Sequence, residues 1–330
     1  MSKKLLEVFK APKGNQLLLP VIRKHLLMEV NSVDPDRDTS HLHVSEMSRS
    51  DWCARRAYYR VTGAQVDPVK PMSWSLGNVF AEGNQVQSKY EDMFWSRGWL
   101  WGRFKCIDCG ESRHTLSPDT CWVCGGNLAY METTIVDSSR RLIGNIDIVL
   151  MMEDSTVLVE VKTVGLGTVR YSAPALFDRY AAGAKTLDQV WSDIHRPFLA
   201  HRLQAGMYLA LAPELVPELK DVEEVRFLYE WKPSQDVKEF VLTRDKALEE
   251  VGPLLEEATV FSKHVALGKV PLRPNWAAPG GAICGDCPHR TVCWADEVDE
   301  KGDRDNGESA KVSVKKTSSA RRRKVVGPTK

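Results

Sequence analysis

The chain has 330 residues, of which 43% are hydrophobic and 27% charged, with a formal net charge of +1. This composition is typical of a soluble globular protein of about two domains and excludes collagen-like and wholly disordered classes. There is no apolar run long enough for a membrane helix and no secretion signal at the N-terminus, so we expect a cytoplasmic protein without a membrane partner. Any affinity for nucleic acid must come from local basic patches.

Three helices are predicted in the N-terminal third of the chain. The apolar stretch 16–30 predicts the first helix, and a polar linker completes an N-terminal segment over 1–44. The second helix carries the sequence DWCARRAYYR, is capped by Ser48 or Ser50 and ends near Gly63. After a proline-containing loop, SLGNVFAEGNQVQSKYEDMFWSRG predicts a third helix that ends near Gly98.

Residues 99–130 form a segment of short pieces with paired cysteines. CIDCG holds Cys106 and Cys109, and CWVCGG holds Cys121 and Cys124. Two C-x2-C knuckles about a dozen residues apart are typical of a zinc ribbon. Four thiolates leave no open position for water, so we expect a structural zinc ion that folds an insert too small for its own core. A redox role for one C-x2-C pair is the alternative.

Two strand-like runs follow, at 141–152 and 155–164, and their short separation predicts a hairpin. The hairpin brings Asp147 beside Glu160, and the two-residue spacing places Glu160 and Lys162 on one face of their strand. Adjacent carboxylates repel each other, and a divalent metal between them is the usual solution. A lysine beside that metal suits phosphodiester hydrolysis. A surface hairpin with an ordinary Glu–Lys pair is the alternative.

The next part of the chain alternates between helical and strand patterns. A loop-rich stretch is expected at 165–184, followed by a long helical pattern over 188–212 that Pro197 breaks or kinks. Gln204 and Tyr208 are four residues apart and share a face of this helix, as in many ordinary amphipathic helices. EVRFLYEWK and VKEFVLTR then predict a second pair of strands.

The C-terminal part begins with a helix predicted from Asp245 to Leu267. The residues from 297 to 330 are polar, lack periodicity and contain the sequence RRRK near their end. We predict a disordered basic tail. The other basic clusters could contact phosphates, although each one alone is more simply a solvated face: Arg55, Arg56 and Arg60 in the second helix, and Arg140 with Arg141 before the Asp147 strand.

The four remaining cysteines are divided between the two ends of the chain. Cys53 stands alone, whereas Cys284, Cys287 and Cys293 follow a C-x2-C-x5-C spacing. Without an export signal, these cysteines favour metal ligation over disulfides. The spacing leaves open an iron–sulfur cluster, a zinc site on the same cysteines or with His289, and reduced thiols.

The order of these motifs resembles the RecB-type branch of the PD-(D/E)xK nucleases, in particular the CRISPR-associated iron–sulfur exonucleases and their phage-type relatives. The sequence GNID supplies the aspartate of the PD-(D/E)xK motif, and EVK supplies the second half of that motif. Gln204 and Tyr208 match the QxxxY motif of this branch. The resemblance covers most of 45–295. It implies a nuclease domain over 45–296 with a central mixed β-sheet flanked by helices, in which the zinc ribbon is an insertion.

The resemblance also implies the roles of the candidate site residues. Asp147 and Glu160 would bind one or two Mg²⁺ or Mn²⁺ ions, with the carbonyl of Val161 as a further ligand, and Lys162 would orient or activate water. Gln204 and Tyr208 would hold the DNA strand or brace the lysine.

Two further features of these nucleases bear on the cofactors. Their upstream helix carries a histidine that this chain lacks near 81–83, so Glu82, or with less support Glu91, is the expected substitute. The resemblance also implies that one 4Fe-4S cluster is bound by four cysteines, namely Cys53, Cys284, Cys287 and Cys293.

The resemblance therefore implies a Mg²⁺- or Mn²⁺-dependent deoxyribonuclease. We expect an exonuclease that trims DNA ends in recombination, repair or phage replication. The chain contains no P-loop motif, so a helicase or recombination partner would supply any unwinding. The alternative is a non-catalytic DNA-binding or assembly subunit that keeps the fold. A zinc-ribbon transcription or replication factor would explain only the cysteines at 106–124.

Overall fold

The computed structural model describes residues 17–32 and 37–295. All of these residues belong to one compact unit. The predicted basic tail at 297–330 lies outside the described residues, as do parts of the predicted N-terminal segment.

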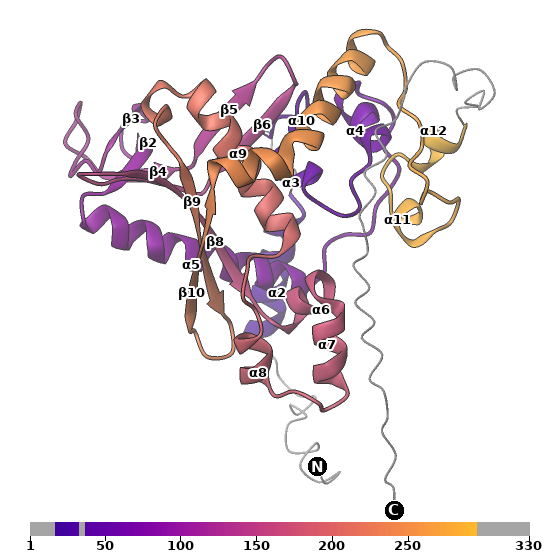
Figure 1. The fold of residues 1–330 in the computed structure, drawn as a ribbon, viewed down its shortest axis with the longest axis horizontal. Coiled ribbons are helices and arrows are strands. Elements are labelled where there is room, and N and C mark those ends of the chain that lie inside the picture. The colour runs from indigo at the N-terminus through magenta and orange to yellow at the C-terminus, as the bar shows by residue number, and fades with distance from the viewer. Residues whose placement is uncertain (1–16, 33–36, 296–330) are drawn as a thin grey trace, which may run out of the picture. The chain divides into compact units, whose positions relative to one another are not determined.

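A seven-stranded mixed sheet, here called the main sheet, runs through this unit (Figure 1). β8 and β9 are parallel, and the other neighbours in the sheet are antiparallel. β8 is central and almost wholly buried, as its run of valines predicts. Along the sheet the strands are β10 (Val237–Thr243), β9 (Glu224–Trp231), β8 (Thr156–Val164), β7 (Ile148–Met151), β2 (Leu100–Cys106) and β3 (Ser112–Leu116), with β4 (Leu128–Met131) also paired to β2.

A second, three-stranded sheet, here called the small sheet, consists of β1 (Leu42–His43), β6 (Leu142–Ile146) and β5 (Thr133–Asp137). The prediction of a single strand over 141–152 was therefore wrong. This run forms β6 and β7, which belong to two different sheets, and Asp147 lies at their junction. The burial of the two strands gives the physical reason. In β6 buried and more exposed residues alternate, which suits a sheet with one free face, whereas β7 is buried on both faces.

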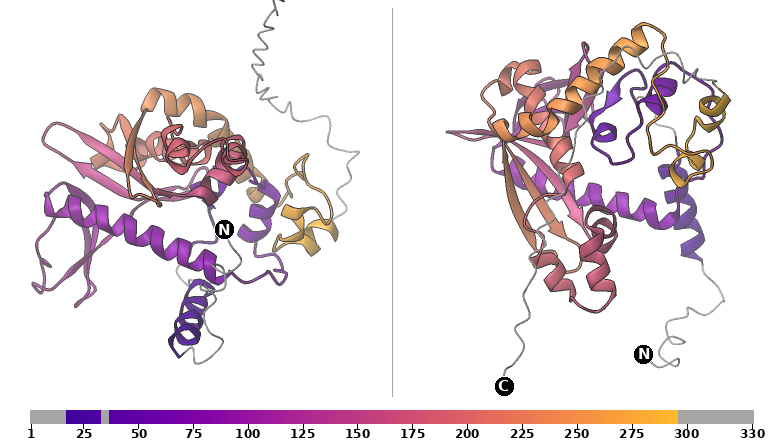
Figure 2. Two further views of the ribbon diagram at one scale, coloured as in Figure 1. Left: turned by 90° about the horizontal axis from the view of Figure 1, so that it is seen from below. Right: turned by 45° about the vertical axis from the view of Figure 1, so that its right-hand side comes forward.

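Helices cover both faces of the main sheet (Figures 1 and 2). α5 (Trp74–Ser96), predicted from the sequence, packs on the face that carries Val157, Val159 and Val161. α9 (Leu199–Leu215) and α10 (Arg244–Ala266) pack on the opposite face. Strand alternation places Glu160 and Lys162 on this α9 face. The predicted mixed sheet flanked by helices is confirmed.

Two shorter predictions were wrong. The stretch 165–184 contains α6 (Leu166–Ser172) and α7 (Pro174–Ala181), and Pro174 suits the first turn of a helix. The cap of α4 (Ala54–Val61) is Cys53, whose sulfur accepts the backbone N–H of Arg56, and Ser48 instead ends a short upstream helix.

The remaining helices connect these layers. The break near Pro197 is confirmed, since α8 ends before it and α9 begins after it. α4 lies beside the C-terminal helices α11 and α12 in both figures. The helices not yet given bounds are α2 (Leu18–Val30), α3 (Val44–Met47), α8 (Leu187–Ser192), the 3-10 helix η1 (Pro217–Leu219), α11 (Ala282–Gly285) and α12 (Arg290–Ala295).

Candidate functional site

Asp147, Glu160 and Lys162, here called the acid–lysine group, meet on the α9 face of the main sheet. The Lys162 Nζ lies 2.5 Å from Glu160 Oε1 and 3.6 Å from Asp147 Oδ2. The backbone N–H of Val161 donates to Asp147 Oδ2 at 3.1 Å and so fixes that carboxylate. Asp147 is 7% exposed and Glu160 only 1%. This burial contradicts the alternative of an ordinary surface pair.

Burial and mutual repulsion change the acid–base properties of the group. Burial, together with the neighbouring Asp147 carboxylate, raises the pKa of Glu160. Burial alone would lower the pKa of Lys162, but Asp147 and Glu160 outweigh it and hold that pKa above its ordinary value. Lys162 therefore stays an ammonium ion at neutral pH and is suited to donating hydrogen bonds rather than accepting a proton.

α9 brings Gln204 and Tyr208 to the same place. The Gln204 side-chain amide donates to the Tyr208 hydroxyl at 3.3 Å, and Tyr208 is only 3% exposed. Burial is the main cause that raises the pKa of Tyr208, and the Glu160 and Asp147 charges raise it further. The predicted QxxxY pair thus borders the acid–lysine group.

A close contact between β6 and α9 sets the position of Tyr208. A Cβ atom added at Gly144 would lie 2.5 Å from the Tyr208 ring. We expect Gly144→Ala to displace the ring and destabilise the protein by about 1–3 kcal/mol in urea unfolding. Gly252 in α10 has no atom within 4 Å of an added Cβ, so Gly252→Ala should be neutral or stabilising. Equal stability of the two variants would refute the close contact.

The structure does not bring Glu82 into the group. Glu82 is exposed, and its carboxylate pairs with the Lys232 Nζ at 2.6 Å. Two other carboxylates, those of Glu91 and Glu132, interact electrostatically with the group. Each accepts a hydrogen bond from the side-chain amide of Gln87 at 2.9 Å. Sequence reasoning missed Glu132 entirely, because no motif marks the residue that joins β4 to β5.

Glu91 and Glu132 respond electrostatically to Asp147. Burial, together with the charges of Glu132 and Asp147, raises the pKa of Glu91 to about 7, against the lowering effect of the Gln87 hydrogen bond. Burial and then Asp147 also raise the pKa of Glu132. Four carboxylates therefore crowd this region, opposed by the single ammonium of Lys162.

The raised pKa of Glu91 predicts a pH-dependent stability. Its folded-state pKa of about 7 exceeds the ordinary value of 4.5, so the contribution to stability is complete below about pH 4.5 and is lost as the pH rises through 7. Without added divalent metal, Glu91→Gln should gain about 2 kcal/mol over the native chain between pH 5 and pH 8, after allowance for solvent screening. Urea unfolding across this range measures the difference. Glu249→Gln, at an exposed position, is the control, and parallel pH profiles of Glu91→Gln and the native chain would contradict the prediction.

A polar cavity of about 560 Å³ opens beside Asp147. Tyr208 and Gln204 form one part of its wall, and Glu132 lies with Asp147. The small sheet and the segment before it supply the rest, including Arg37, Asp38, His43, Ser45, Thr134, Ile143, Gly144 and Asn145. None of these was a sequence-based candidate, because short strands such as β1 leave little periodic signal.

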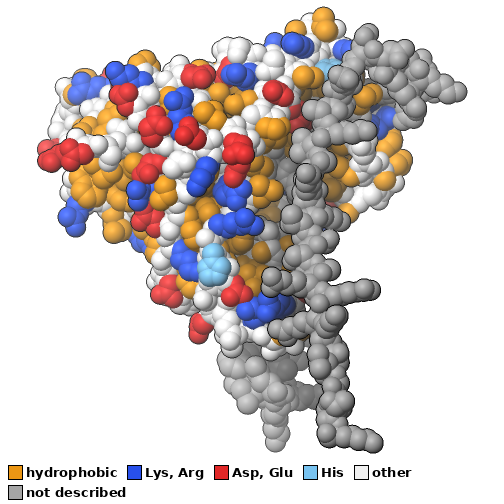
Figure 3. All heavy atoms as spheres, in the orientation of Figure 1, with side chains coloured by type: hydrophobic (Ala, Val, Ile, Leu, Met, Phe, Trp, Pro, Cys, Tyr) orange, Lys and Arg blue, Asp and Glu red, His pale blue; other side chains and the backbone are white. Residues whose placement is uncertain are grey.

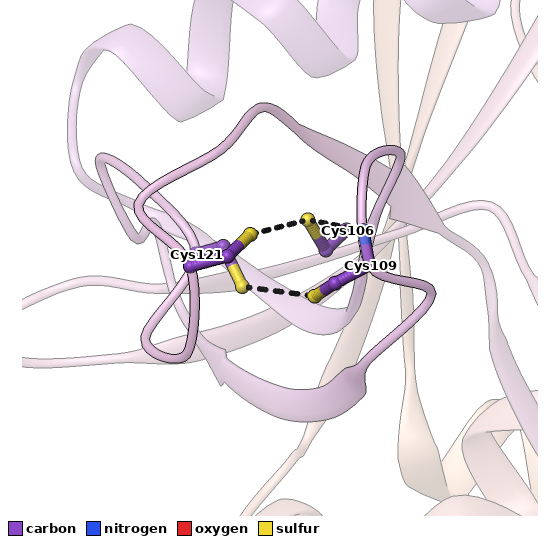
Figure 4. A group of neighbouring side chains, drawn as sticks. Cys106, Cys109 and Cys121 are labelled. Carbon is purple, nitrogen blue, oxygen red and sulfur yellow. Dashed lines mark hydrogen bonds between the residues drawn. The ribbon is translucent and has the colours of Figure 1, made fainter.

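Cys106, Cys109, Cys121 and Cys124, here called the ribbon quartet, gather as the sequence predicts. Their sulfur atoms lie within 4.8 Å of one another, and no other group of three or more His, Cys, Asp or Glu side chains in the described part of the chain does so. The Cys109–Cys121 sulfur distance is 3.7 Å (Figure 4). The Cys106–Cys124 sulfur distance is 3.5 Å. Tetrahedral Zn–S bonds of about 2.3 Å imply sulfur separations of about 3.8 Å. The quartet can therefore hold one metal ion.

The ribbon is continuous with the main sheet. β2 pairs with β7 at one end, with β4 at the other, where Cys106 is opposite Leu128, and with β3 along most of its length. Cys106 and Cys121 are buried in the same apolar cluster as β7 and β8 residues. The hydroxyl of Tyr130, on β4, donates to the Asp147 carbonyl at 3.3 Å. The ribbon thus contacts the backbone of the acid–lysine group.

Cys53, Cys284, Cys287 and Cys293, here called the terminal quartet, line one pocket between α4 and the C-terminal helices. Burial raises the pKa of Cys53 and of Cys287. The four sulfur atoms are more widely spaced than those of the ribbon quartet, since they form no group within 4.8 Å. The structure brings together four cysteines that are far apart in sequence.

The arginines beside Cys53 are engaged within the protein. Arg55 is fully buried and donates to the carbonyls of Pro271 and Cys293. Arg60 pairs with Glu46 at 2.8 Å. The prediction of a solvated face for Arg55 was wrong, and a phosphate contact is no better supported, because its buried guanidinium holds α4 to the C-terminal segment.

Acidic and basic side chains are interspersed on the face shown in Figure 3. None of the helices in the described ranges is long and apolar enough to span a membrane.

Comparison with known proteins gives matches to solved structures. No protein-family model matches the chain, and no curated protein matches it. Among solved structures, the one titled "Crystal structure of SSO0001" matches with a TM-score of 0.38 and 14% sequence identity, over 84% of this chain and 96% of that chain.

Proposed function

We propose that the chain is a metal-dependent DNA nuclease of the RecB type with a PD-(D/E)xK core. The observation that carries the proposal is the convergence of Asp147, Glu160 and Lys162 on one buried face, opposite Gln204 and Tyr208. Two carboxylates and a lysine on neighbouring strands suit phosphodiester hydrolysis, and the adjoining polar cavity leaves room for a substrate strand.

The donor set fits Mg²⁺ or Mn²⁺. Carboxylate oxygens are the ligands that these hard cations prefer. Burial, and then repulsion from Asp147, raises the pKa of Glu160, and a cation would offset both effects. Asp147 and Glu160 would hold the metal, with Glu132 a nearer third carboxylate than Glu82. When bound, the metal would stabilise charge that develops on the phosphate oxygens.

The protein's own residues act in this site without Lys162 removing a proton. The Lys162 ammonium donates a hydrogen bond to the attacking water or to a phosphate oxygen and balances the nearby carboxylates. The Val161 N–H keeps the Asp147 carboxylate in place. Gln204 orients Tyr208, whose ring packs under β6.

The two cysteine groups suit different cofactors. The short sulfur distances of the ribbon quartet fit a single zinc ion. In the terminal quartet the thiols are farther apart, as they are in a 4Fe-4S cluster, where each cysteine binds a different iron atom. Such a cluster would tie α4 to the C-terminal helices.

Cleavage of end-labelled linear DNA tests the function. Anaerobically purified protein would be incubated with single- and double-stranded substrates in the presence of Mg²⁺, Mn²⁺ or EDTA. We expect metal-dependent shortening from an end, and the label position gives the polarity. If cluster-loaded protein cleaves neither substrate, the nuclease proposal fails, and a non-catalytic DNA-binding or assembly subunit becomes the better reading.

A further inference from the structure

The free face of the small sheet leads directly away from the acid–lysine group. Asn145, on β6, and Asp147, at the junction that follows β6, both line the polar cavity, and Thr134 is the cross-strand partner of Asn145. The wall of the polar cavity therefore continues from carboxylates to neutral and basic side chains.

The hydrogen bonds on this face leave side-chain donors in the cavity available to a ligand. Thr134 donates its hydroxyl to Asn145 Oδ1 at 2.9 Å, which fixes the amide and leaves its NH₂ group as a donor. The Ser45 hydroxyl and the Arg37 guanidinium line the same cavity. Arg37 is 57% exposed and lies 4.0 Å from its nearest acidic partner, Glu46, so that ion pair is weak.

Asp38 is the one acidic residue at this end of the cavity, and it already has hydrogen-bond partners within the protein. Asp38 accepts hydrogen bonds from the backbone N–H groups of Ser40 and His41, at 2.7 and 2.9 Å, and contacts the His41 ring. The His43 ring donates to the Asp38 carbonyl. Asp38 is therefore occupied within its own turn, while Arg37 remains available to an anion.

We propose that Arg37, Ser45 and Asn145 form a subsite for the phosphate next to the scissile phosphate of a bound nucleic-acid strand. The proposal rests on the proposed nuclease function, since the acid–lysine group defines the scissile position. The strand then lies across the free face of the small sheet. Backbone phosphate is the ligand class, and a planar guanidinium beside an amide donor suits its oxygens.

Binding of a short fluorescein-labelled DNA single strand tests the subsite. Anisotropy titrations without added divalent metal, over a range of NaCl concentrations, would compare the native chain with Arg37→Gln, Asn145→Ala and the double variant. The double variant should bind about tenfold more weakly. Arg37→Gln should also reduce the slope of log K against log salt by about 0.7, the value for one contact to a single strand.

Matched controls are available at exposed positions in α5 and directly after its end. Arg97→Gln and Asn84→Ala make the same chemical changes outside the cavity and should retain native affinity and salt slope. Strands with one methylphosphonate linkage supply a second readout: a single neutral linkage should weaken binding to the native chain but cause no further loss in the double variant.

The outcomes separate this proposal from the nuclease function. Native affinity and salt slope in both single variants and the double variant, or no binding of the strand by the native chain, would overturn the subsite. Reduced binding without any Mg²⁺-dependent cleavage by the native chain would retain the subsite and refute the nuclease. Cleavage by the native chain together with unchanged binding by the variants would retain the nuclease and refute the subsite.

Discussion

Replacing Lys162 with alanine is expected to slow Mg²⁺-dependent DNA cleavage by about 100- to 1,000-fold and to leave the protein folded. Lys162 lies 2.5 Å from Glu160 and 3.6 Å from Asp147, and it supplies the one ammonium among four crowded carboxylates. Alanine removes the donor that would stabilise the reacting phosphate. Single-turnover cleavage of end-labelled DNA measures the loss.

The control for this change is a lysine that faces solvent, away from the acid–lysine group. Lys246, in α10, is exposed, so Lys246→Ala should cleave at the native rate. Circular dichroism and thermal unfolding would establish that both variants are folded. Cleavage by Lys162→Ala within a factor of a few of the native rate would remove the lysine from the mechanism.

Loss of the ribbon metal is expected to have the largest effect on stability. Cys121→Ser should reduce the metal content by about one ion per chain and destabilise the protein by about 3–5 kcal/mol, because metal binding is coupled to folding in such sites. Cys121 is 3% exposed and belongs to the apolar cluster shared with β7 and β8. Elemental analysis and urea unfolding provide the two measurements.

The effect of the ribbon should also reach the acid–lysine group. Tyr130 donates to the Asp147 carbonyl, so loosening β4 should lower cleavage as well as stability. Val123→Ser changes an exposed residue of the same knuckle, without removing a ligand, and should retain both metal and stability. The iron content of Cys121→Ser should stay native, since the terminal quartet is separate. Unchanged metal content in Cys121→Ser would contradict the ribbon site.

Several features follow from local sequence because they depend on short spacings. The β7–β8 hairpin brings Asp147 to Glu160, and the two-residue period fixes Glu160 and Lys162 on one face. The ribbon quartet likewise depends on two tight turns and on pairing between neighbouring strands. The four-residue period of α9 aligns Gln204 with Tyr208. Each of these needs little knowledge of distant segments.

Other features were decided by packing between distant segments. Burial of both faces of β7 but only one face of β6 divided the run 141–152 between two sheets, and that division opened the polar cavity. Docking of α5 brought in Glu91 and Gln87 and left Glu82 exposed, although periodicity alone does not tell which helical face a sheet will cover.

The sequence by itself thus determined the acid–lysine group, the ribbon quartet and most helices and strands. Tertiary structure decided the rest of the site: Glu132, the donors of the small sheet, and the burial of Arg55 against the C-terminal segment. The physical reason is that the periodicities of helices and strands relate residues that are only a few positions apart in the sequence. Desolvation and contacts between distant segments depend on which surfaces meet, and only the folded chain specifies them.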